Sequence, residues 1–170
     1  MKEFMKEWVI PIIGVFILAI LIQRFVFFHV LVPTGSMLPT INTGDRMFVI
    51  REYRPESLKT GDIVVFKVYP EGGQELYVKR LIGTPGDTVT ILDGAVSVNG
   101  VELVEDYIAY RDSYSGEFRV PEGKYFFLGD NRRDSKDSRN SEIGLIDESD
   151  ILAKAGLRFW PLNNFGLINK

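Results

Sequence analysis

The 170-residue sequence contains no cysteine and a single histidine, His29. Without cysteine there can be no disulfide, no thiolate nucleophile and no sulfur-ligated metal. A Ser-His-Asp site would have to use His29, which lies among apolar residues beside a long hydrophobic run, and the geometric demands of such a triad argue against that position. The lack of cysteine therefore excludes thiol-based sites, and the position of the single histidine disfavours a Ser-His-Asp site.

The sequence also lacks a dense cluster of basic residues. Its 20 Lys and Arg residues are offset by 23 Asp and Glu residues, which gives a formal net charge of -3. Proteins that bind phosphate backbones need a concentrated basic surface, so we predict no nucleic-acid partner. The length suits one globular domain beside an apolar segment.

One long apolar run occupies residues 8–28, in which Gln23 and Arg24 are the only strongly polar residues. Its length matches the roughly 20 residues that a helix needs to cross a bilayer core. A cleaved secretory signal would have a shorter apolar core followed by a small-x-small site, whereas FFHVLVPTG stands here. We therefore predict an uncleaved transmembrane anchor at residues 8–28, with the lipid bilayer as a partner, after a short tail at residues 1–7.

The rest of the chain shows short apolar runs bounded by Gly, Pro, Asp or Asn, which are typical of strands. Such runs lie at residues 46–50, 62–66, 76–82 and 124–128. Residues 151–170, with Phe159, Trp160 and Phe165, favour a final strand that closes the core, and contact with the membrane interface is the alternative. We predict a mainly β fold that follows one N-terminal transmembrane helix.

Two turn signals lie close together in the middle of the chain. The runs and their turns are 88–92, Asp93-Gly94, 95–98, Asn99-Gly100 and 101–104. Because Asp-Gly and Asn-Gly favour the type I′ turns of hairpins, they predict a three-stranded meander, which a polar, turn-prone stretch at 112–116 follows. We predict that residues 87–122 form a small β-hairpin insertion in a core made of residues 29–86 and 123–170.

A serine occupies the turn-forming segment 33–40, PTGSMLPT, a short distance after the apolar run. The tether from Phe28 spans at most about 28 Å, which keeps Ser36 near the membrane surface. Taken alone, a serine in a Gly/Pro turn is more often a turn residue than a nucleophile.

A pair of basic residues lies in the strand-like segment 77–87, YVKRLIGTPGD. Alternation places Lys79 on one face with Tyr77 and Leu81, and Arg80 on the other, so one of the two must face inward. Burial among apolar groups disfavours the ammonium form and lowers the pKa of a lysine, which makes the amine a base near neutral pH. The alternative is that Lys79 reaches water and is solvated.

The segment 129–139, GDNRRDSKDSR, is a dense run of charges and hydroxyl groups. It does not match a calcium loop, because Arg132 and Asp134 occupy the alternate positions after Asp130 and the glycine and terminal glutamate of such a loop are missing. We therefore predict no metal. The segment is either a solvated loop or an ion-paired, hydrogen-bonded scaffold beside a site.

In this order, and behind an N-terminal span, these segments resemble the type I signal peptidases, a family of Ser/Lys endopeptidases. The strings GSMLPT, GDIVVF, YVKRLIGTPGD and GDNRRDSKDSR are similar to that family's sequence boxes, and AGLRFWP near the C-terminus is similar to its last strand. The single anchor and the short insertion resemble the compact bacterial members. The resemblance implies a serine endopeptidase without a cofactor that cuts signal peptides from exported preproteins after small-x-small sites.

The resemblance also implies a role for individual residues. It makes Ser36 the nucleophile that forms an acyl-enzyme and neutral Lys79 the general base. It makes the Ser36 backbone N–H and the Thr34 hydroxyl the hydrogen-bond donors that stabilise the oxyanion. The implied supporting residues are Ser135, which orients the lysine amine, and the ion pairs Asp130 with Arg80 and Asp137 with Arg139.

An extended substrate strand would point alternate side chains into the enzyme, so two pockets would sample residues spaced two apart. Small, shallow pockets then select Ala-x-Ala. The residues predicted to line them are Val30, Val32, Ile41, Tyr77 and Val78.

The orientation of the anchor has a weak signal in the sequence. Lys2 and Lys6 before the apolar run slightly outnumber Arg24 near its far end, which favours an inside N-terminus. Exported chains present their cleavage sites at the outer surface, so the resemblance implies the same orientation. We predict a single-pass protein of the cell membrane with a cytoplasmic N-terminus and an extracytoplasmic catalytic domain.

Two other functions fit parts of the sequence. A self-cleaving repressor-type peptidase shares the Ser/Lys arrangement but needs a DNA-binding domain and a cleavable linker, neither of which this sequence displays. A non-catalytic, membrane-anchored β domain that binds a partner is the alternative from another class. The reactivity of Ser36 separates that alternative from an enzyme.

Overall fold

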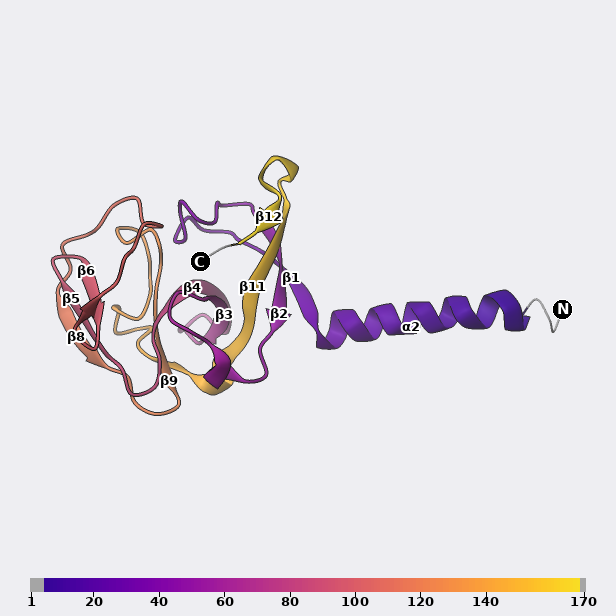
Figure 1. The fold of residues 1–170 in the computed structure, drawn as a ribbon, viewed down its shortest axis with the longest axis horizontal. Helices are drawn as coiled ribbons and strands as arrows, with labels where there is room; N and C mark the ends of the chain where they lie inside the picture. The colour runs from indigo at the N-terminus through magenta and orange to yellow at the C-terminus, as the bar shows by residue number, and fades with distance from the viewer. Residues whose placement is uncertain (1–4, 169–170) are drawn as a thin grey trace.

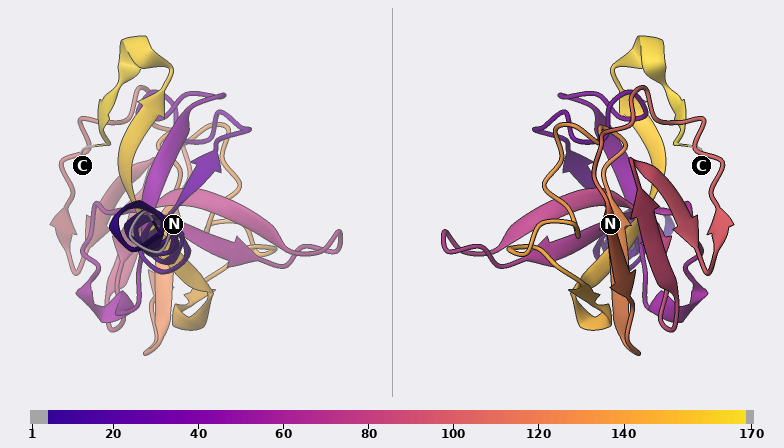
Figure 2. Two further views of the ribbon diagram at one scale, coloured as in Figure 1. Left: turned by 90° about the vertical axis from the view of Figure 1, so that its right-hand side faces the viewer. Right: turned by 90° about the vertical axis from the view of Figure 1, so that its left-hand side faces the viewer.

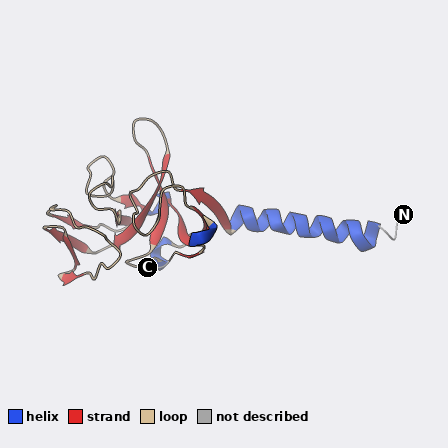
Figure 3. Ribbon diagram, turned by 90° about the horizontal axis from the view of Figure 1, so that it is seen from above, coloured by secondary structure: helices blue, strands red, loops and turns tan. Residues whose placement is uncertain are grey.

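The computed structural model describes residues 5–168. Residues 1–4 of the predicted tail 1–7 and residues 169–170 of the predicted core therefore lie outside the described residues. The described chain is mainly β with one N-terminal apolar helix, as the sequence predicted (Figure 1). Coloured by secondary structure, the helix projects from one end of a body made of strands and loops (Figure 3).

The N-terminal helix begins as a π-helical stretch, η1 (Met5–Val9), and continues as α2 (Ile10–Phe25). Its 21 residues rise about 32 Å, so the helix is long and apolar enough to cross a membrane. None of the residues of η1 or α2 is buried against the β domain. A helix that is apolar all round and covered by no protein is suited to an apolar surrounding such as lipid.

The helix ends before the predicted end of the apolar run at residue 28. Phe27 and Phe28 belong to β1 (Phe27–Leu31), which pairs antiparallel with β2 (Arg46–Arg51). Aromatic side chains suit both a lipid-facing helix and a half-buried strand, so apolarity alone does not locate this boundary.

The C-terminal end of the helix is tied to the sheet by two side chains from the end of β2 and just beyond it. Arg51 Nε donates a hydrogen bond to the carbonyl of Arg24 at 3.0 Å, and the Tyr53 hydroxyl donates to the carbonyl of Phe25 at 2.7 Å. Carbonyls in the last turn of a helix have no partner within the helix, so these bonds satisfy them. They also connect the C-terminal end of the helix directly to the β domain.

Eight strands form an antiparallel sheet that carries the site (Figure 1). Its order is β1-β2-β11-β3-β4-β9-β10, with β12 paired to β11. The remaining strands are β3 (Ile63–Val68), β4 (Glu75–Gly83), β9 (Lys124–Leu128), β10 (Ile146–Asp147), β11 (Ile151–Trp160) and β12 (Gly166–Leu167). Because β11 lies between β2 and β3, the prediction of a final strand in this part of the chain is confirmed for Ile151–Trp160.

Strands β3 and β4 form a long hairpin that extends to one side of the body (Figure 2). Short 3-10 turns join other strands of the sheet. They are η2 (Pro55–Ser57), η3 (Glu148–Asp150) and η4 (Leu162–Asn164).

A second sheet has four strands in the order β7-β6-β5-β8. Its strands are β5 (Thr88–Leu92), β6 (Ala95–Val98), β7 (Val101–Glu102) and β8 (Gly116–Arg119). Asp93 and Asn99 have φ angles of 47° and 52°, the left-handed backbone that a type I′ turn requires at its first central residue. The predicted meander is therefore present with a shorter third strand, and β8 is an addition that its four residues, GEFR, gave too little alternation to predict.

Strand β4 runs through the middle of the apolar core, and from Val78 onward it is covered on both faces. Val78 packs in a cluster with Met37 and Ile41, whereas Leu81 and Ile82 belong to two other clusters. Every residue from Val78 to Gly83 is buried. The sequence required only one of the two adjacent basic residues of this strand to face inward, and the structure buries both.

Candidate active site

Ser36 lies in a turn between β1 and β2 that its own apolar residues fix in place. Met37 and Ile41 are fully buried, and the Ile41 N–H donates a hydrogen bond to the Met37 carbonyl at 2.9 Å. The side chains after the serine thus anchor the turn in the core. Ser36 is only 9% exposed and lies in the wall of a cavity.

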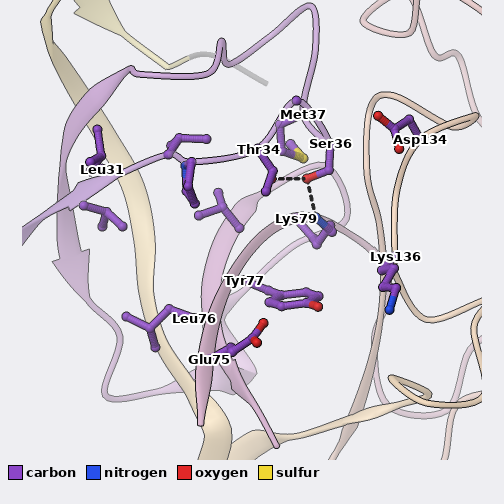
Figure 4. Close-up of a pocket in the computed structure, with 15 residues that line it drawn as sticks. Leu31, Thr34, Ser36, Met37, Glu75, Leu76, Tyr77, Lys79, Asp134 and Lys136 are labelled. Atoms are coloured by element: carbon purple, nitrogen blue, oxygen red, sulfur yellow. Dashed lines mark hydrogen bonds between the residues drawn. The ribbon is translucent and has the colours of Figure 1, made fainter. Parts of the chain in front are cut away.

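Lys79 reaches Ser36 from the middle of β4 (Figure 4). Its Nζ donates a hydrogen bond of 2.5 Å to Ser36 Oγ, and the lysine is 4% exposed. The Thr34 Oγ1 lies 3.4 Å from the same serine oxygen (Figure 4). Segments 43 residues apart in the sequence therefore place an amine against one hydroxyl group and a second hydroxyl beside it.

Burial lowers the pKa of the Lys79 amine from its ordinary value of 10.5 to about 8, while the nearby carboxylates of Asp137 and Asp130 act in the opposite direction. The aromatic ring of Tyr77, on the same face of β4, has its centroid 5.2 Å from Lys79 Nζ. A pKa near 8 leaves about a tenth of the amine neutral at pH 7, compared with less than about 0.1% for an unperturbed lysine. The amine is therefore able to accept a proton.

Arg80, the other basic residue of β4, holds the segment 129–139 in place. Its Nε and Nη2 donate to the two carboxylate oxygens of Asp130 at 2.8 and 2.6 Å. Thr40 Oγ1 donates to Asp130 Oδ2 at 2.5 Å, and Arg80 Nη1 donates to the Gly61 carbonyl at 2.9 Å. One buried carboxylate thus links β4, the end of the serine turn and the charged segment.

Asp137 pairs with Arg139 and also holds the backbone next to the serine. Arg139 Nε donates to Asp137 Oδ1 at 2.8 Å, and the Gly129 N–H donates to Asp137 Oδ2 at 3.0 Å. A Cβ atom added at Gly129 would lie 2.5 Å from the Ser36 carbonyl oxygen and even closer to the Ser135 hydroxyl. Only glycine allows the two segments to approach so closely.

Ser135 does not make the contact that the resemblance implies. Its Oγ is buried, forms no hydrogen bond within the described part of the chain, and lies next to Gly129. The predicted bond from Ser135 to the Lys79 amine is therefore absent in this structure, where Lys79 Nζ bonds to Ser36 Oγ instead.

A cavity of about 550 Å³ opens beside Ser36 and Lys79 (Figure 4). Four of the five residues predicted to line a substrate pocket are in its wall: Val30, Val32, Tyr77 and Val78. The prediction is wrong for Ile41, which packs fully buried in the core and is not part of the wall. The turn 33–40 is not a strand, so alternation does not bring Ile41 to the cavity. Glu75, Asp134 and Lys136 supply charged groups at its rim.

The contacts of several residues around the site had no signal in the sequence. Arg132 forms a buried ion pair with Glu105, and its Nε donates to the Gly129 carbonyl at 3.0 Å. The Tyr107 ring lies 3.7 Å from the guanidinium carbon of Arg80. Glu105 and Tyr107 follow β7 in a stretch without strand periodicity, so only the folded chain brings them to the two arginines. Within the described residues, no group of three His, Cys, Asp or Glu side chains is placed to hold a metal ion.

A serine hydroxyl bonded to a buried lysine amine in the wall of an apolar cavity is an arrangement of the serine hydrolases. The chain matches the sequence model of the family described as "Signal peptidase, peptidase S26" over residues 5–160. It belongs to that family and is a serine endopeptidase, which confirms the resemblance found in the sequence.

The chain is also similar to individual proteins and to a solved structure. The chain is 41% identical over 176 residues to a signal peptidase I of Bacillus licheniformis, covering 95% of this chain and 92% of the relative. It is 37% identical over 185 residues to signal peptidase IB of Staphylococcus aureus, covering 97% and 94%. A crystal structure of a signal peptidase I from Enterococcus faecalis is 33% identical, with a TM-score of 0.47, over 58% of this chain and 96% of its own.

Proposed function

We propose that this chain is a single-pass membrane signal peptidase that removes signal peptides from exported preproteins with Ser36 as nucleophile and Lys79 as general base. The observation that carries the proposal is the 2.5 Å hydrogen bond between Lys79 Nζ and Ser36 Oγ, together with the burial that lowers the pKa of the amine to about 8. A base with a pKa near the working pH within hydrogen-bond reach of a hydroxyl is the arrangement that activates a nucleophile.

In the first half of the reaction, Ser36 Oγ attacks the scissile carbonyl carbon while neutral Lys79 takes the hydroxyl proton. The tetrahedral intermediate then collapses, Lys79 gives that proton to the leaving amine, and the mature protein departs with a new N-terminus. The signal peptide remains bound to Ser36 as an ester. In the second half, Lys79 takes a proton from water, the resulting hydroxide attacks the ester, and the proton returns to Ser36 Oγ.

Two observations support a site for the oxyanion that forms in both halves. Within the described residues, the Ser36 N–H donates to no other group, so it is free for a substrate oxygen. The Thr34 hydroxyl lies 3.4 Å from Ser36 Oγ, within reach of an oxygen bonded to the carbon that this serine attacks. We assign the oxyanion to these two donors.

Thr34→Val is expected to lower kcat by about 10²- to 10³-fold with little change in KM, because the hydroxyl acts mainly on charge that develops in the transition state. Steady-state kinetics with a peptide substrate measure both constants. Thr43→Val provides a matched control in the same turn region. An equal change in KM, or an unchanged kcat, would remove Thr34 from the oxyanion site.

The cavity lies between two strand segments that have unpaired edges. β1 is an edge strand, and within the described chain the first half of β4 pairs only with β3. An extended peptide between them has backbone partners on both sides, and its alternate side chains point toward Val30, Val32, Tyr77 and Val78. An apolar wall this close to the serine suits apolar side chains such as alanine at the two alternate positions, and this supports the proposed Ala-x-Ala sites.

The test of the proposed function is cleavage of a model preprotein by the purified full-length protein in detergent micelles. Mass spectrometry of the product is expected to show a mature N-terminus directly after an Ala-x-Ala site. A preprotein with Phe in place of the last Ala is the matched substrate control and is expected to stay intact. Failure to cut the first, or equal cutting of both, would contradict the proposal.

The orientation of the anchor is a further part of the proposal. With the N-terminus in the cytoplasm, the β domain lies outside, where exported chains present their cleavage sites. Protease added to intact cells or right-side-out vesicles is then expected to digest the β domain and leave a protected fragment that contains α2. A β domain that becomes accessible only after the membrane is opened would show the reverse orientation.

A further inference from the structure

Asn131 holds the serine turn at two adjacent points. Its backbone N–H donates to the Ser36 carbonyl at 3.0 Å, and its side-chain Nδ2 donates to the Gly35 carbonyl at 3.1 Å. A carbonyl oxygen only accepts hydrogen bonds, so the amide nitrogen of the side chain has to face Gly35. The two bonds thus hold the carbonyls of two successive peptide units, Gly35–Ser36 and Ser36–Met37.

The bond to Gly35 has a consequence for the neighbouring N–H. The Gly35 carbonyl and the Ser36 N–H belong to the same peptide unit, which is planar, and in a trans peptide the two bonds point in opposite directions. Holding the carbonyl toward Asn131 therefore directs the N–H away from it. This N–H is the backbone donor that the proposed mechanism assigns to the oxyanion.

The backbone around Asn131 is itself held in place by neighbouring contacts. Asp130, the preceding residue, is fixed by Arg80 and Thr40, and the Asp134 N–H donates to the Asn131 carbonyl at 3.0 Å. The closeness of Gly129 to the Ser36 carbonyl brings this backbone against the turn. The backbone is thus fixed on both sides of Asn131, whose side chain bonds to the Gly35 carbonyl.

We propose that Asn131 is a positioning residue that orients the Gly35–Ser36 peptide so that the Ser36 N–H points at the oxyanion. This rests on the proposed role of Ser36. A fixed donor stabilises transition-state charge because it needs no reorientation during the reaction, whereas a peptide unit free to tilt loses part of that effect. Asn131 acts through Ser36 and does not contact the substrate.

The experiment compares the full-length wild type with Asn131→Ala, Asn131→Asp and the control Asn140→Ala. Asp has nearly the volume of Asn but, as a carboxylate, cannot donate to Gly35. The backbone bond from residue 131 to Ser36 is kept in each variant. Asn140 lies beyond the same charged segment, and its side chain accepts a hydrogen bond from the Glu142 N–H in a local turn.

We expect both Asn131 variants to lower kcat by about 10- to 100-fold, with KM changed less than about twofold. The loss is smaller than that for complete removal of a donor, because the Ser36 N–H remains. Affinity for a peptide aldehyde, which forms a tetrahedral adduct with the serine, is expected to fall by the same factor as kcat/KM. The apparent pKa in the pH profile of Asn131→Ala is expected to match the wild type, since Lys79 keeps its surroundings.

Three outcomes would overturn the role of Asn131. They are an unchanged kcat, a rise in KM by the same factor as the fall in kcat, and a shifted pH profile in Asn131→Ala. If Asn131→Ala fails to fold, Asn131→Asp decides, and unfolding of both variants would make Asn131 a residue of the fold alone. A Ser36→Ala chain that still cleaves the substrate would instead remove the proposed function. The two failures are therefore distinguishable.

Discussion

Lys79→Arg is expected to abolish preprotein cleavage, with a loss of at least about 10³-fold in kcat/KM. Arginine keeps its proton at every working pH, so it supplies a positive charge but no base. A lysine that acted only through its charge would tolerate the exchange. The comparison therefore separates a base from an electrostatic partner at the same position.

The pH dependence of the wild type tests the same point. Because the pKa of Lys79 is lowered to about 8, kcat/KM with a peptide substrate is expected to rise as the pH increases through about 8 and then level off. The residual activity of Lys79→Arg is expected to lack this step. Substantial activity of Lys79→Arg, or a wild-type profile without a rise in this range, would remove Lys79 from the mechanism.

Arginine is larger than the lysine that it replaces at a buried position, so Lys79→Arg could lose activity by unfolding. A second variant, whose stability is measured, provides the control. Lys79→Met removes the amine and keeps a similar chain length. In the native state the amine loses its proton near pH 8, but in the unfolded state only near 10.5, so the wild-type free energy of unfolding rises with pH between these values. Below pH 8 the folded protein carries a destabilisation of about 3 kcal/mol from this group.

We therefore expect Lys79→Met to be inactive, folded and up to about 3 kcal/mol more stable than the wild type at pH 7. Its stability is also expected to lose the rise between pH 8 and 10.5. Urea denaturation at several pH values measures both effects. A Lys79→Met protein that unfolds more readily than the wild type would show that the buried amine stabilises the fold.

Ser36→Ala is expected to abolish cleavage as well, with a loss on the order of 10⁴-fold or more, because no other group can form the ester. The variant is expected to fold, since the turn is anchored by Met37 and Ile41 and loses a single hydroxyl group. Ser97→Ala is a matched control, because its hydroxyl bonds to the Thr90 carbonyl in the small sheet, away from the cavity.

Cleavage of the preprotein, product sequencing and thermal unfolding are the measurements for the two serine variants. Full activity is expected for Ser97→Ala and none for Ser36→Ala at a similar melting temperature. Retained processing by Ser36→Ala at the authentic site would show that another residue is the nucleophile. That result would also favour the alternative in which the β domain binds a partner without catalysis.

Local sequence patterns predicted most of the fold. The four apolar runs fall on strands β2, β3, β4 and β9, with only Asp62 outside its strand, and Asp93 and Asn99 form the turns that their dipeptides favour. The boundary at Phe25 was missed because Phe27 and Phe28 suit a lipid-facing helix and a strand equally well. Strand periodicity also failed after β7, where Glu105 and Tyr107 take their places through contacts with arginines far away in the sequence.

The ordered motifs pointed to Ser36 and Lys79, and the folded chain brings the two together. The burial of Lys79 and Arg80 could not be derived from alternation, which assigns one face to solvent, whereas β4 is covered on both faces from Val78 onward. The role of Ser135 was predicted from the resemblance alone, and its hydroxyl lies beside Gly129 without a bond to the lysine. Contacts such as that of Asn131 with Gly35 depend on how two loops meet, which no local pattern encodes.

The most direct test of the Ser36/Lys79 chemistry is to trap the acyl-enzyme. A peptide ester that ends in Ala-x-Ala with a good leaving group acylates faster than it deacylates, so the intermediate accumulates and survives an acid quench. Mass spectrometry of the digested protein is expected to find the peptide acyl group on Ser36, and to find none in Lys79→Met at neutral pH. An acyl group on another residue, or equal labelling of Lys79→Met, would contradict the account.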